Sequence, residues 1–375
     1  MVEPIEGVFL AQDEDGRSAL CEAIEQADQI AVDTEFHAER RFIPELMLMQ
    51  IATGPESIWL LDPRAIDPAP VAKLLGEKEL IVHGGQQDLR ILTALGARPT
   101  RLLDTQQAAG LLGVRYPERL SVLCEHFLDI PVDKSATLTD WSTRPLTSRQ
   151  LRYAAEDARL LLPLSARLRS LLDEQERTEW AFELGAEQCT KASRGAQPED
   201  LLQTWEICSR LEDDARKVIA ALQVWRFQQA QHRDQPMYYI LPDSMLLDIA
   251  RRRPTSIRSL AENRRLHHGL IKRHGRTILG CIQDAISGPV PRPVPTLQQH
   301  RQARLLAVWA ELIGEEMHIA PRLLLPDPMK VVRTGTAGLT GWRKVCKTRL
   351  ENFLTGKEVI TIDGSLKKSC LRVTN

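Results

Sequence analysis

The first 172 residues alternate short apolar runs with amphipathic segments, which is the pattern of an α/β domain. Runs rich in Ile, Val and Leu predict strands at residues 8–10, 30–34, 46–52, 57–61, 80–82 and 102–104. Helical spacing predicts helices between several of these runs, such as 18–27 and 88–95. The early strands follow one another closely, and the later ones are separated by helices. This order predicts a mixed sheet, antiparallel first and parallel later.

A third helix is predicted to begin near Thr147. Pro145 blocks an earlier start, and Thr147 and Gln150 have the spacing of a capping box. A Glu-rich helix should follow at about 174–191, and 191–200 reads as a linker. Beyond it the pattern becomes helical and basic.

A small helical module occurs twice in the second half. LQVWRF and LPDSM, with Trp225 and Met245, recur as LAVWAE and LPDPM, with Trp309 and Met329, and both shifts are 84 residues. The segment SGPVPRPVPT between the copies favours an extended spacer. We expect these Trp and Met side chains to lie in the core. The expected domains are 1–195, 205–288 and 297–375, with a Pro-rich linker at 289–296.

Composition narrows the class of protein. With 375 residues, 43% hydrophobic and 26% charged, the chain should form two or three globular domains. No apolar run approaches the roughly 20 residues of a membrane helix, and the N-terminal residues do not resemble a secretory signal. Seven dispersed cysteines without a C-x-x-C pair predict reduced thiols and a cytoplasmic protein.

Charge is divided unequally along the chain. Residues 1–200 carry a net charge of −13, and residues 201–375 carry +12. A basic half attracts a polyanion, because phosphate contacts dominate the affinity for nucleic acids. The alternative is an ordinary set of solvated helix faces.

Four carboxylates and one tyrosine carry the candidate chemistry. Asp33 and Glu35 are two apart on a strand, so they share a face. Tyr153 and Asp157 are four apart on a helix and also share a face. Asp88 follows a strand and a Gly-Gly turn, at a helix start. Singly, such residues are more often caps or solvated positions. Together, in these contexts, they predict a cleft with four carboxylates.

A cleft of this composition favours divalent cations. Converging carboxylates repel one another and take up protons unless a cation offsets their charge. Two divalent ions remove this conflict and activate a water for attack on a phosphodiester. Magnesium suits oxygen ligands. The hydroxyl of Tyr153 is placed to orient the attacking water.

The motifs DTEF, the apolar run into Asp88, and YAAED resemble the three motifs of the DEDDy family of 3′→5′ exonucleases. The resemblance implies a ribonuclease H-like fold and two bound metal ions, Mg²⁺ or Mn²⁺. It implies that Asp33, Glu35 and Asp157 ligate metal directly and that Asp88 holds the second ion largely through water. Tyr153 would position the nucleophile.

The likeness extends beyond these motifs. The segment DKSATLTDWSTRPLTSRQLRYAAED is similar to the one that leads into the third motif of the bacterial ribonuclease D family. The helical repeats resemble HRDC modules, which are all-α. The resemblance implies a hydrolase that trims the 3′ ends of transfer-RNA precursors and other small structured RNAs. It would release nucleoside 5′-monophosphates, and we expect a monomer.

Other residues have weaker assignments. We expect phosphate contacts from Arg251, Arg252, Arg253, Arg264, Arg265, Lys272, Arg273 and Arg276. His83 and Asp104 are expected to be structural. Lys134, Trp141 and Arg144 are expected along the substrate path. Core packing is expected for Tyr238 and Tyr239, with base stacking as the alternative.

Two other functions remain open. A DNA exonuclease of proofreading or Werner type has the same metal site. A non-catalytic RNA-binding scaffold on a nuclease fold is the other alternative, because a fold alone does not establish a function.

Overall fold

The protein forms two compact units in its computed structural model, which describes residues 5–132, 139–195, 197–198, 201, 206–263, 265–288, 294–362 and 371–374. The first unit comprises residues 1–37, 44–195 and 306–375. The second unit comprises residues 38–43 and 196–305. The described helices include none with the length and hydropathy needed to cross a bilayer.

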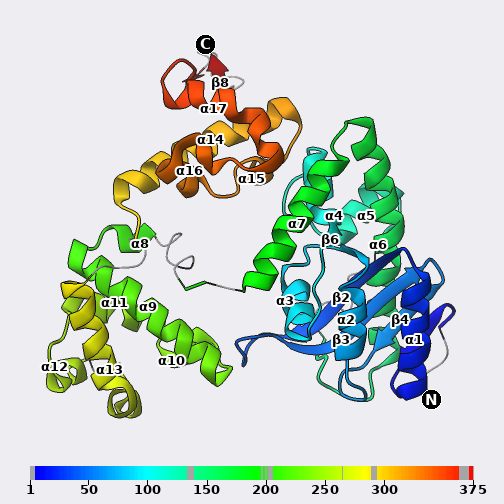
Figure 1. Cartoon of the computed structure of the whole chain (residues 1–375), viewed down its shortest axis with the longest axis horizontal. Coiled ribbons are helices and arrows are strands. Elements are labelled where there is room, and N and C mark those ends of the chain that lie inside the picture. The colour runs from blue at the N-terminus through cyan, green and yellow to red at the C-terminus, as the bar shows by residue number, and fades with distance from the viewer. Residues whose placement is uncertain are drawn as a thin grey trace. The chain divides into compact units, whose positions relative to one another are not determined.

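A six-stranded mixed sheet forms the centre of the first unit, in the order β1-β4-β3-β2-β5-β6 (Figure 1). Its strands are β1 (Val8–Ala11), β2 (Gln29–His37), β3 (Glu45–Gly54), β4 (Ser57–Leu61), β5 (Glu79–Val82) and β6 (Arg101–Asp104). Strand β3 is antiparallel to β2 and β4, and the other pairs are parallel. The six predicted strands and the mixed sheet are confirmed.

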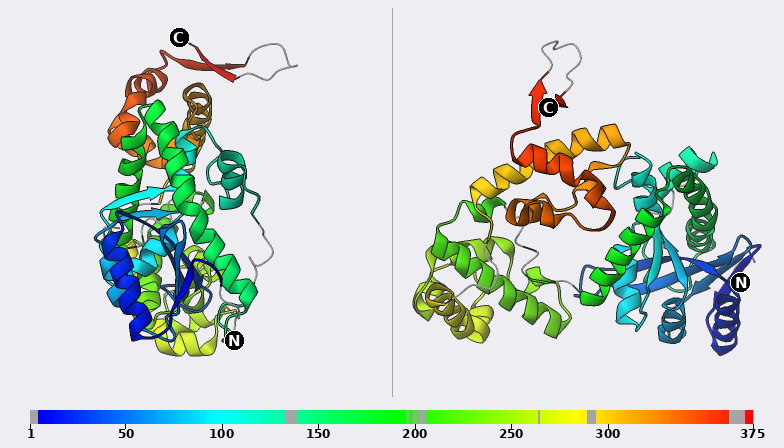
Figure 2. Two further views of the ribbon diagram at one scale, coloured as in Figure 1. Left: turned by 90° about the vertical axis from the view of Figure 1, so that its right-hand side faces the viewer. Right: turned by 45° about the horizontal axis from the view of Figure 1, so that its top comes forward.

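Helices cover both faces of this sheet. They are α6 (Ser148–Glu174) on one face and α1 (Glu14–Gln26), α2 (Ala69–Leu75) and α3 (Gln86–Ala94) on the other (Figure 2, left). Ala31 of β2 shares a core with Ala155 and Ala158 of α6. Val32, one residue later, shares a core with Leu20 of α1. Successive residues of β2 therefore face different helices, and Asp33 and Glu35 follow Ala31 toward α6.

A β-bulge interrupts the pairing of β2 with β3 beside Glu35. Glu35 lies opposite Leu48, but Phe36 lies opposite Leu46. Met47 is therefore an extra residue on β3. A bulge of this kind bends the strand and changes the direction of neighbouring side chains, and such bulges are frequent near active sites.

The start of α6 is fixed as the sequence predicts. Thr147 is the N-cap, and its side chain and that of Gln150 form both hydrogen bonds of a capping box. The predicted Glu-rich helix is α7 (Thr178–Arg194), which packs on β6. Two further helices, α4 (Thr105–Leu111) and α5 (Leu120–Leu128), lie between β6 and α6.

The last helices of the chain share a core with the helices that pack on the sheet of the first unit. They are α14 (Leu297–Met317), α15 (Pro321–Leu324), α16 (Pro328–Thr334) and α17 (Lys347–Leu354). Trp309 and Leu323 are buried in one cluster with Leu168 of α6 and Leu184 of α7. The region also contains a two-stranded sheet, β7 (Val359–Ile362) with β8 (Leu371–Thr374). The prediction that the last module is purely helical is therefore wrong for this part of the chain.

The second unit is helical. Its main elements are α8 (Glu206–Ser209), α9 (Asp213–Arg233), α10 (Met237–Ile240), α11 (Asp243–Arg252), α12 (Ile257–Ala261) and α13 (His268–Ser287). Trp225 lies in the long helix α9, and Trp309 lies in the long helix α14. In both copies this long helix is followed by a four-residue helix, an LPD turn and a further helix. The repeated Trp and Met side chains, including Met245 and Met329, are buried as predicted.

The contact between α7 and β6 provides a test of the fold. A Cβ atom on Gly185 would lie 1.9 Å from the carbonyl oxygen of Leu102. Gly185→Ala should therefore push α7 away from the sheet and lower the free energy of unfolding by about 1–3 kcal/mol. Chemical denaturation checks this expectation. Gly280→Ala is the matched control, because a Cβ there meets no atom within 4 Å.

Candidate active site

Three carboxylates from two elements meet at one end of the sheet. Carboxylate oxygens of Asp33 and Glu35, on β2, and of Asp157, on α6, lie within 4.8 Å of one another. All three side chains are half-buried. The close approach follows from the alternation of β2, which directs both of its acids toward α6.

Asp88 joins this cluster from the first turn of α3. It is 7% exposed, and the hydroxyl of Thr34 donates to its Oδ1 at 2.5 Å. Thr34 lies between Asp33 and Glu35, so one short stretch of β2 carries two of the acids and a hydrogen-bond donor to Asp88. The charge of Asp88 also raises the pKa of Asp33.

Burial and repulsion raise the pKa of each of these carboxyls. Burial, followed by the charges of Asp157 and Asp88, raises the pKa of Glu35 to about 8. Burial raises the pKa of Asp157 and of Asp88 to about 6. Burial and the neighbouring carboxylates also raise the pKa of Asp33. The cluster can hold its full negative charge at neutral pH only beside a cation.

The donor set fits a hard divalent cation, because it consists of carboxylate oxygens. Gln50 lies directly opposite Asp33 in the β2–β3 ladder, so the two side chains share a face. Gln50 is fully buried, and its amide nitrogen and oxygen have no partner among the described residues. A buried amide without a hydrogen-bond partner often lies beside a bound ion or water. Its position beside the carboxylates is therefore consistent with a site for a hydrated cation. No local pattern in the sequence marks Gln50; its pairing with Asp33 across the strands and its unpartnered amide distinguish it.

Tyr153 lies one helical turn before Asp157, and its hydroxyl donates to the Asp157 carboxylate. This hydrogen bond acts to lower the pKa of Asp157, against the larger effect of burial. The tyrosine ring is half-buried and tilted against Trp141, with 6.2 Å between ring centroids. The phenol is therefore held at the edge of the carboxylate cluster.

Comparison with known proteins agrees with this geometry. A sequence profile described as 3′-5′ exonuclease matches residues 8–173, and one described as HRDC domain matches residues 215–282. Ribonuclease D of Pseudomonas paraeruginosa is 31% identical over 307 residues, which cover 79% of this chain and 81% of that protein. Ribonuclease D of Zymomonas mobilis is 33% identical over 352 residues, covering 87% and 88%. The chain belongs to the ribonuclease D family.

Solved structures support the same assignment. The crystal structure of Escherichia coli RNase D, described as an exoribonuclease involved in structured RNA processing, superposes with a TM-score of 0.78 and 26% identity. The superposition covers 92% of this chain and 98% of the Escherichia coli protein. The catalytic core of RRP6 from Trypanosoma brucei shares the fold, with a TM-score of 0.56 and 23% identity over 75% of this chain and 80% of that chain. The predicted family is confirmed, and with it a 3′→5′ exoribonuclease whose exonuclease domain uses divalent metal.

His83 and Asp104 form hydrogen bonds with other parts of the protein, as their predicted structural role requires. The ring nitrogens of His83 hydrogen-bond to the hydroxyl of Thr105 at 2.9 Å and the carbonyl of Glu118 at 3.0 Å. Burial lowers the pKa of His83. Asp104 accepts from the amide of Gly84 and the side chain of Gln188, both at 2.9 Å. Both residues hold loops together beside the carboxylate cluster.

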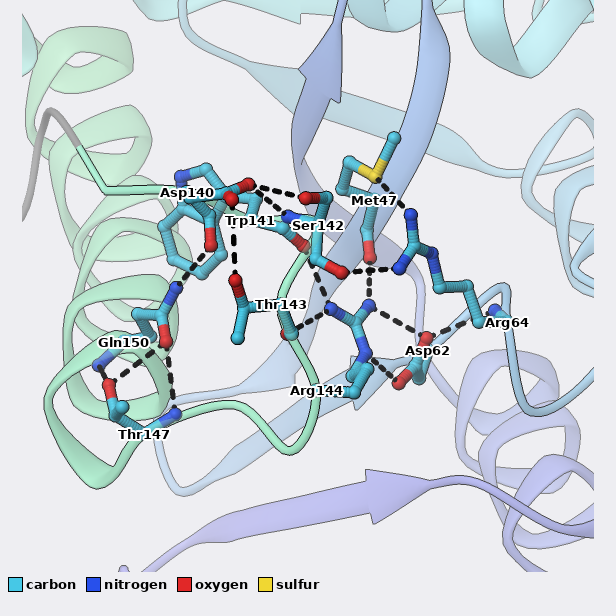
Figure 3. Close-up of polar contacts among 10 residues, drawn as sticks. All are labelled: Met47, Asp62, Arg64, Asp140, Trp141, Ser142, Thr143, Arg144, Thr147 and Gln150. Carbon is cyan, nitrogen blue, oxygen red and sulfur yellow. Dashed lines mark hydrogen bonds and ion pairs between the residues drawn. The ribbon is translucent and has the colours of Figure 1, made fainter.

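The expectation that Trp141 and Arg144 line the substrate path is wrong. Trp141 is only 4% exposed and belongs to a hydrophobic cluster. The guanidinium of Arg144 is occupied by protein acceptors (Figure 3). Sequence alone did not separate a buried arginine from one that faces RNA. Lys134 lies outside the described residues.

Most of the predicted basic residues are exposed on the second unit. Arg251, Arg252, Arg265, Lys272, Arg273 and Arg276 are exposed, Arg253 is half-buried, and Arg264 lies outside the described residues. Arg252 pairs with Asp248 and Glu262, and Arg253 pairs with Glu212. We call the exposed members of this set the basic face. Among the described residues, Arg252 forms ion pairs and the other members of the basic face form none.

Tyr238 and Tyr239 also lie on the surface of the second unit. They are 51% and 55% exposed, and their ring centroids are 4.4 Å apart. The expectation of core packing is therefore wrong for both residues. The hydroxyl of Tyr238 donates to the carbonyl of Glu39 at 3.0 Å, which fixes the position of its ring.

The raised pKa values predict how the stability of the metal-free protein depends on pH. A carboxyl with a raised pKa adds stability below its unfolded pKa near 4 and loses it as pH rises through its folded pKa. That loss should run from about pH 4 to about pH 6 for Asp88 and Asp157, and from about pH 4 to about pH 8 for Glu35. The Tm of metal-free protein should therefore fall across this range, and Mn²⁺ should raise it more at high pH. Asp33→Asn should flatten both effects; a Mn²⁺ shift that is equal at all pH values contradicts the prediction.

Proposed function

We propose that this protein trims the 3′ ends of transfer-RNA precursors and other small structured RNAs by hydrolysis. The observation that carries the proposal is the meeting of Asp33, Glu35 and Asp157 within 4.8 Å. The structured-RNA role described for the Escherichia coli relative supports this class of substrate. The products would be nucleoside 5′-monophosphates, because water attacks the terminal phosphodiester and the 3′ oxygen leaves.

Two divalent ions, Mg²⁺ or Mn²⁺, are the proposed cofactors. Asp33, Glu35 and Asp157 would ligate them directly, and Asp88 would do so largely through water. When bound, such ions activate a water and stabilise charge on the attacking and leaving oxygens. The hydroxyl of Tyr153 would orient the water, since a phenol with a pKa near 10 is a poor base at neutral pH. Asp157 accepts the hydrogen bond of this phenol and so fixes its direction.

The second unit is proposed to hold the body of the RNA. The basic face supplies cations for phosphates, and structured RNA is bound largely through its backbone and shape. The exposed rings of Tyr238 and Tyr239 are available for stacking on unpaired bases. The proposal includes the domain limits 1–195, 205–288 and 297–375, the last as a divergent HRDC-like module. It also includes action as a monomer in the cytoplasm, where such precursors are made.

Substitution of a proposed metal ligand tests the reaction. Asp33→Asn and Asp157→Ala should each reduce trimming by at least about a hundredfold, because metal-dependent water activation is lost. The assay is a time course on an end-labelled, 3′-extended transfer RNA with and without Mg²⁺. RNA binding by the variants should stay within roughly threefold of wild type.

Glu174→Gln is the matched control. Glu174 lies on α6, as Asp157 does, but it is exposed at the far end of the helix and outside the cluster, so trimming should be unchanged. Wild-type protein that binds RNA without trimming it would favour a scaffold. Equal degradation of matched single-stranded RNA and DNA would favour a DNA exonuclease.

The basic face can be tested separately from the chemistry. Combined Lys272→Glu, Arg273→Glu and Arg276→Glu changes should raise KM for the 3′-extended transfer RNA by about tenfold or more and flatten its salt dependence. The kcat on a short oligonucleotide should not change, because the carboxylates are untouched. Arg216→Gln is the control, since Arg216 already pairs with Asp213. An unchanged KM and salt dependence would place RNA binding elsewhere.

A further inference from the structure

One guanidinium connects three segments of the first unit that are far apart in sequence (Figure 3). Arg144 donates from Nε and Nη2 to the two carboxylate oxygens of Asp62, at 2.5 and 2.9 Å. Its Nη2 also donates to the carbonyl of Met47 at 2.7 Å. Its Nη1 donates to the carbonyls of Trp141 and Thr143, at 2.8 and 2.9 Å. These five bonds match the five donors of the side chain, so none is left for substrate.

The bond to Met47 reaches the β-bulge beside Glu35. Met47 is the extra residue of β3, and a bulge leaves one residue out of the regular ladder. The guanidinium of Arg144 provides the carbonyl of Met47 with a donor at this irregular point. The backbone opposite Glu35 is therefore held in its bulged form by a side chain from the segment before α6.

The bonds to Trp141 and Thr143 fix the segment 139–147. The side chain of Arg64 donates to the carbonyl of Ser142 in the same segment. At the other end, the side chain of Gln150 donates to the carbonyl of Asp140 at 3.1 Å. The segment is therefore attached both to the sheet and to the first turn of α6.

Trp141 links this fixed segment to Tyr153 by side-chain packing. The indole is buried in a cluster with Leu146 and Leu151, and Tyr153 packs against this cluster. The Tyr153 hydroxyl in turn donates to Asp157. A displaced indole would allow the phenol to move relative to the carboxylates.

The ion pair with Asp62 is suited to a fixed clamp. Asp62 is 4% exposed. Burial acts to raise its pKa, but hydrogen bonds from Arg144 and from the amide of Arg64 outweigh burial and lower it. A planar guanidinium holds both carboxylate oxygens at once, which a lysine ammonium cannot do.

We propose that Arg144 is a positioning residue for the nuclease reaction. It holds the backbone beside the metal ligand Glu35 through Met47, and it holds the water-orienting Tyr153 through Trp141. This inference rests on the proposed function. It assigns to the guanidinium of Arg144 the alignment of the Glu35 carboxylate on β2 with the Tyr153 phenol on α6.

The test compares Arg144→Lys with wild type in three measurements: kcat and KM on a short single-stranded RNA, Tm, and the rise in Tm on adding Mn²⁺. Misplacement of the aligned groups should lower kcat by about tenfold or more, since displacements near 1 Å have large effects. The KM should change by less than roughly threefold, because Arg144 does not contact RNA. The Mn²⁺-induced rise in Tm should shrink, which reports on Glu35 without requiring turnover.

Arg169→Lys is the matched control. Arg169 pairs with Glu79 on β5 of the same unit, and its side chain is 19% exposed against 22% for Arg144. Arg169→Lys should lower Tm while kcat and the Mn²⁺ response stay at the wild-type level. Asp62→Asn, which keeps the shape of the side chain, should change kcat as Arg144→Lys does, and it provides the test if Arg144→Lys does not fold.

Arg144→Lys with wild-type kcat and Mn²⁺ response but a lower Tm would overturn the inference and leave a purely structural role. A rise in KM alone would also overturn it, in favour of a substrate contact. Failure of the proposed function looks different. In that case wild-type protein itself shows no Mg²⁺-dependent trimming, and the Mn²⁺ response of Tm still compares the variants.

Discussion

The burial of several carboxylates close to one another, which repulsion between them makes still less favourable, is the constraint on which the candidate site depends. Asp33, Glu35, Asp88 and Asp157 would separate or take up protons if their backbones were free to move, as their raised pKa values indicate. The surrounding structure prevents separation by placing the acids on a central strand and two packed helices. A bound divalent cation would offset the remaining charge.

Helix α6 connects this site to the rest of the first unit. Its alanines pack closely on the sheet, its Tyr153 and Asp157 face the carboxylates, and its later leucines share a core with the last helices of the chain. Two arginines, one on each side of α6 in the sequence, hold neighbouring segments in place by donating to backbone carbonyls. Arg144 does so before α6, and Arg177, just before α7, donates to carbonyls of Leu111, Met317 and His318. The last helices therefore support the nuclease core, whatever else they contact.

The two units differ in chemistry. The first unit gathers the carboxylates that are proposed to bind metal. The second presents the basic face and two exposed tyrosines, which suit the phosphates and bases of RNA. Under the proposed function, such a division would let one surface hold many different RNAs while a separate site performs the same hydrolysis on each, because backbone contacts carry little sequence information. Affinity for the body of the RNA and the rate of bond cleavage can then be altered independently.

The sequence determined the six strands, the capping box at Thr147 and the grouping of the acids by face, because these depend on periodicity and spacing over a few residues. The family motifs added the order of the acids and their expected meeting. Tertiary structure alone decided the bulge at Met47, the orphaned amide of Gln50, the internal use of Arg144, the exposure of Tyr238 and the shared core of the last helices. Each of these depends on contacts between residues distant in the chain, and a local pattern does not record which distant carbonyl, carboxylate or helix face a side chain will meet.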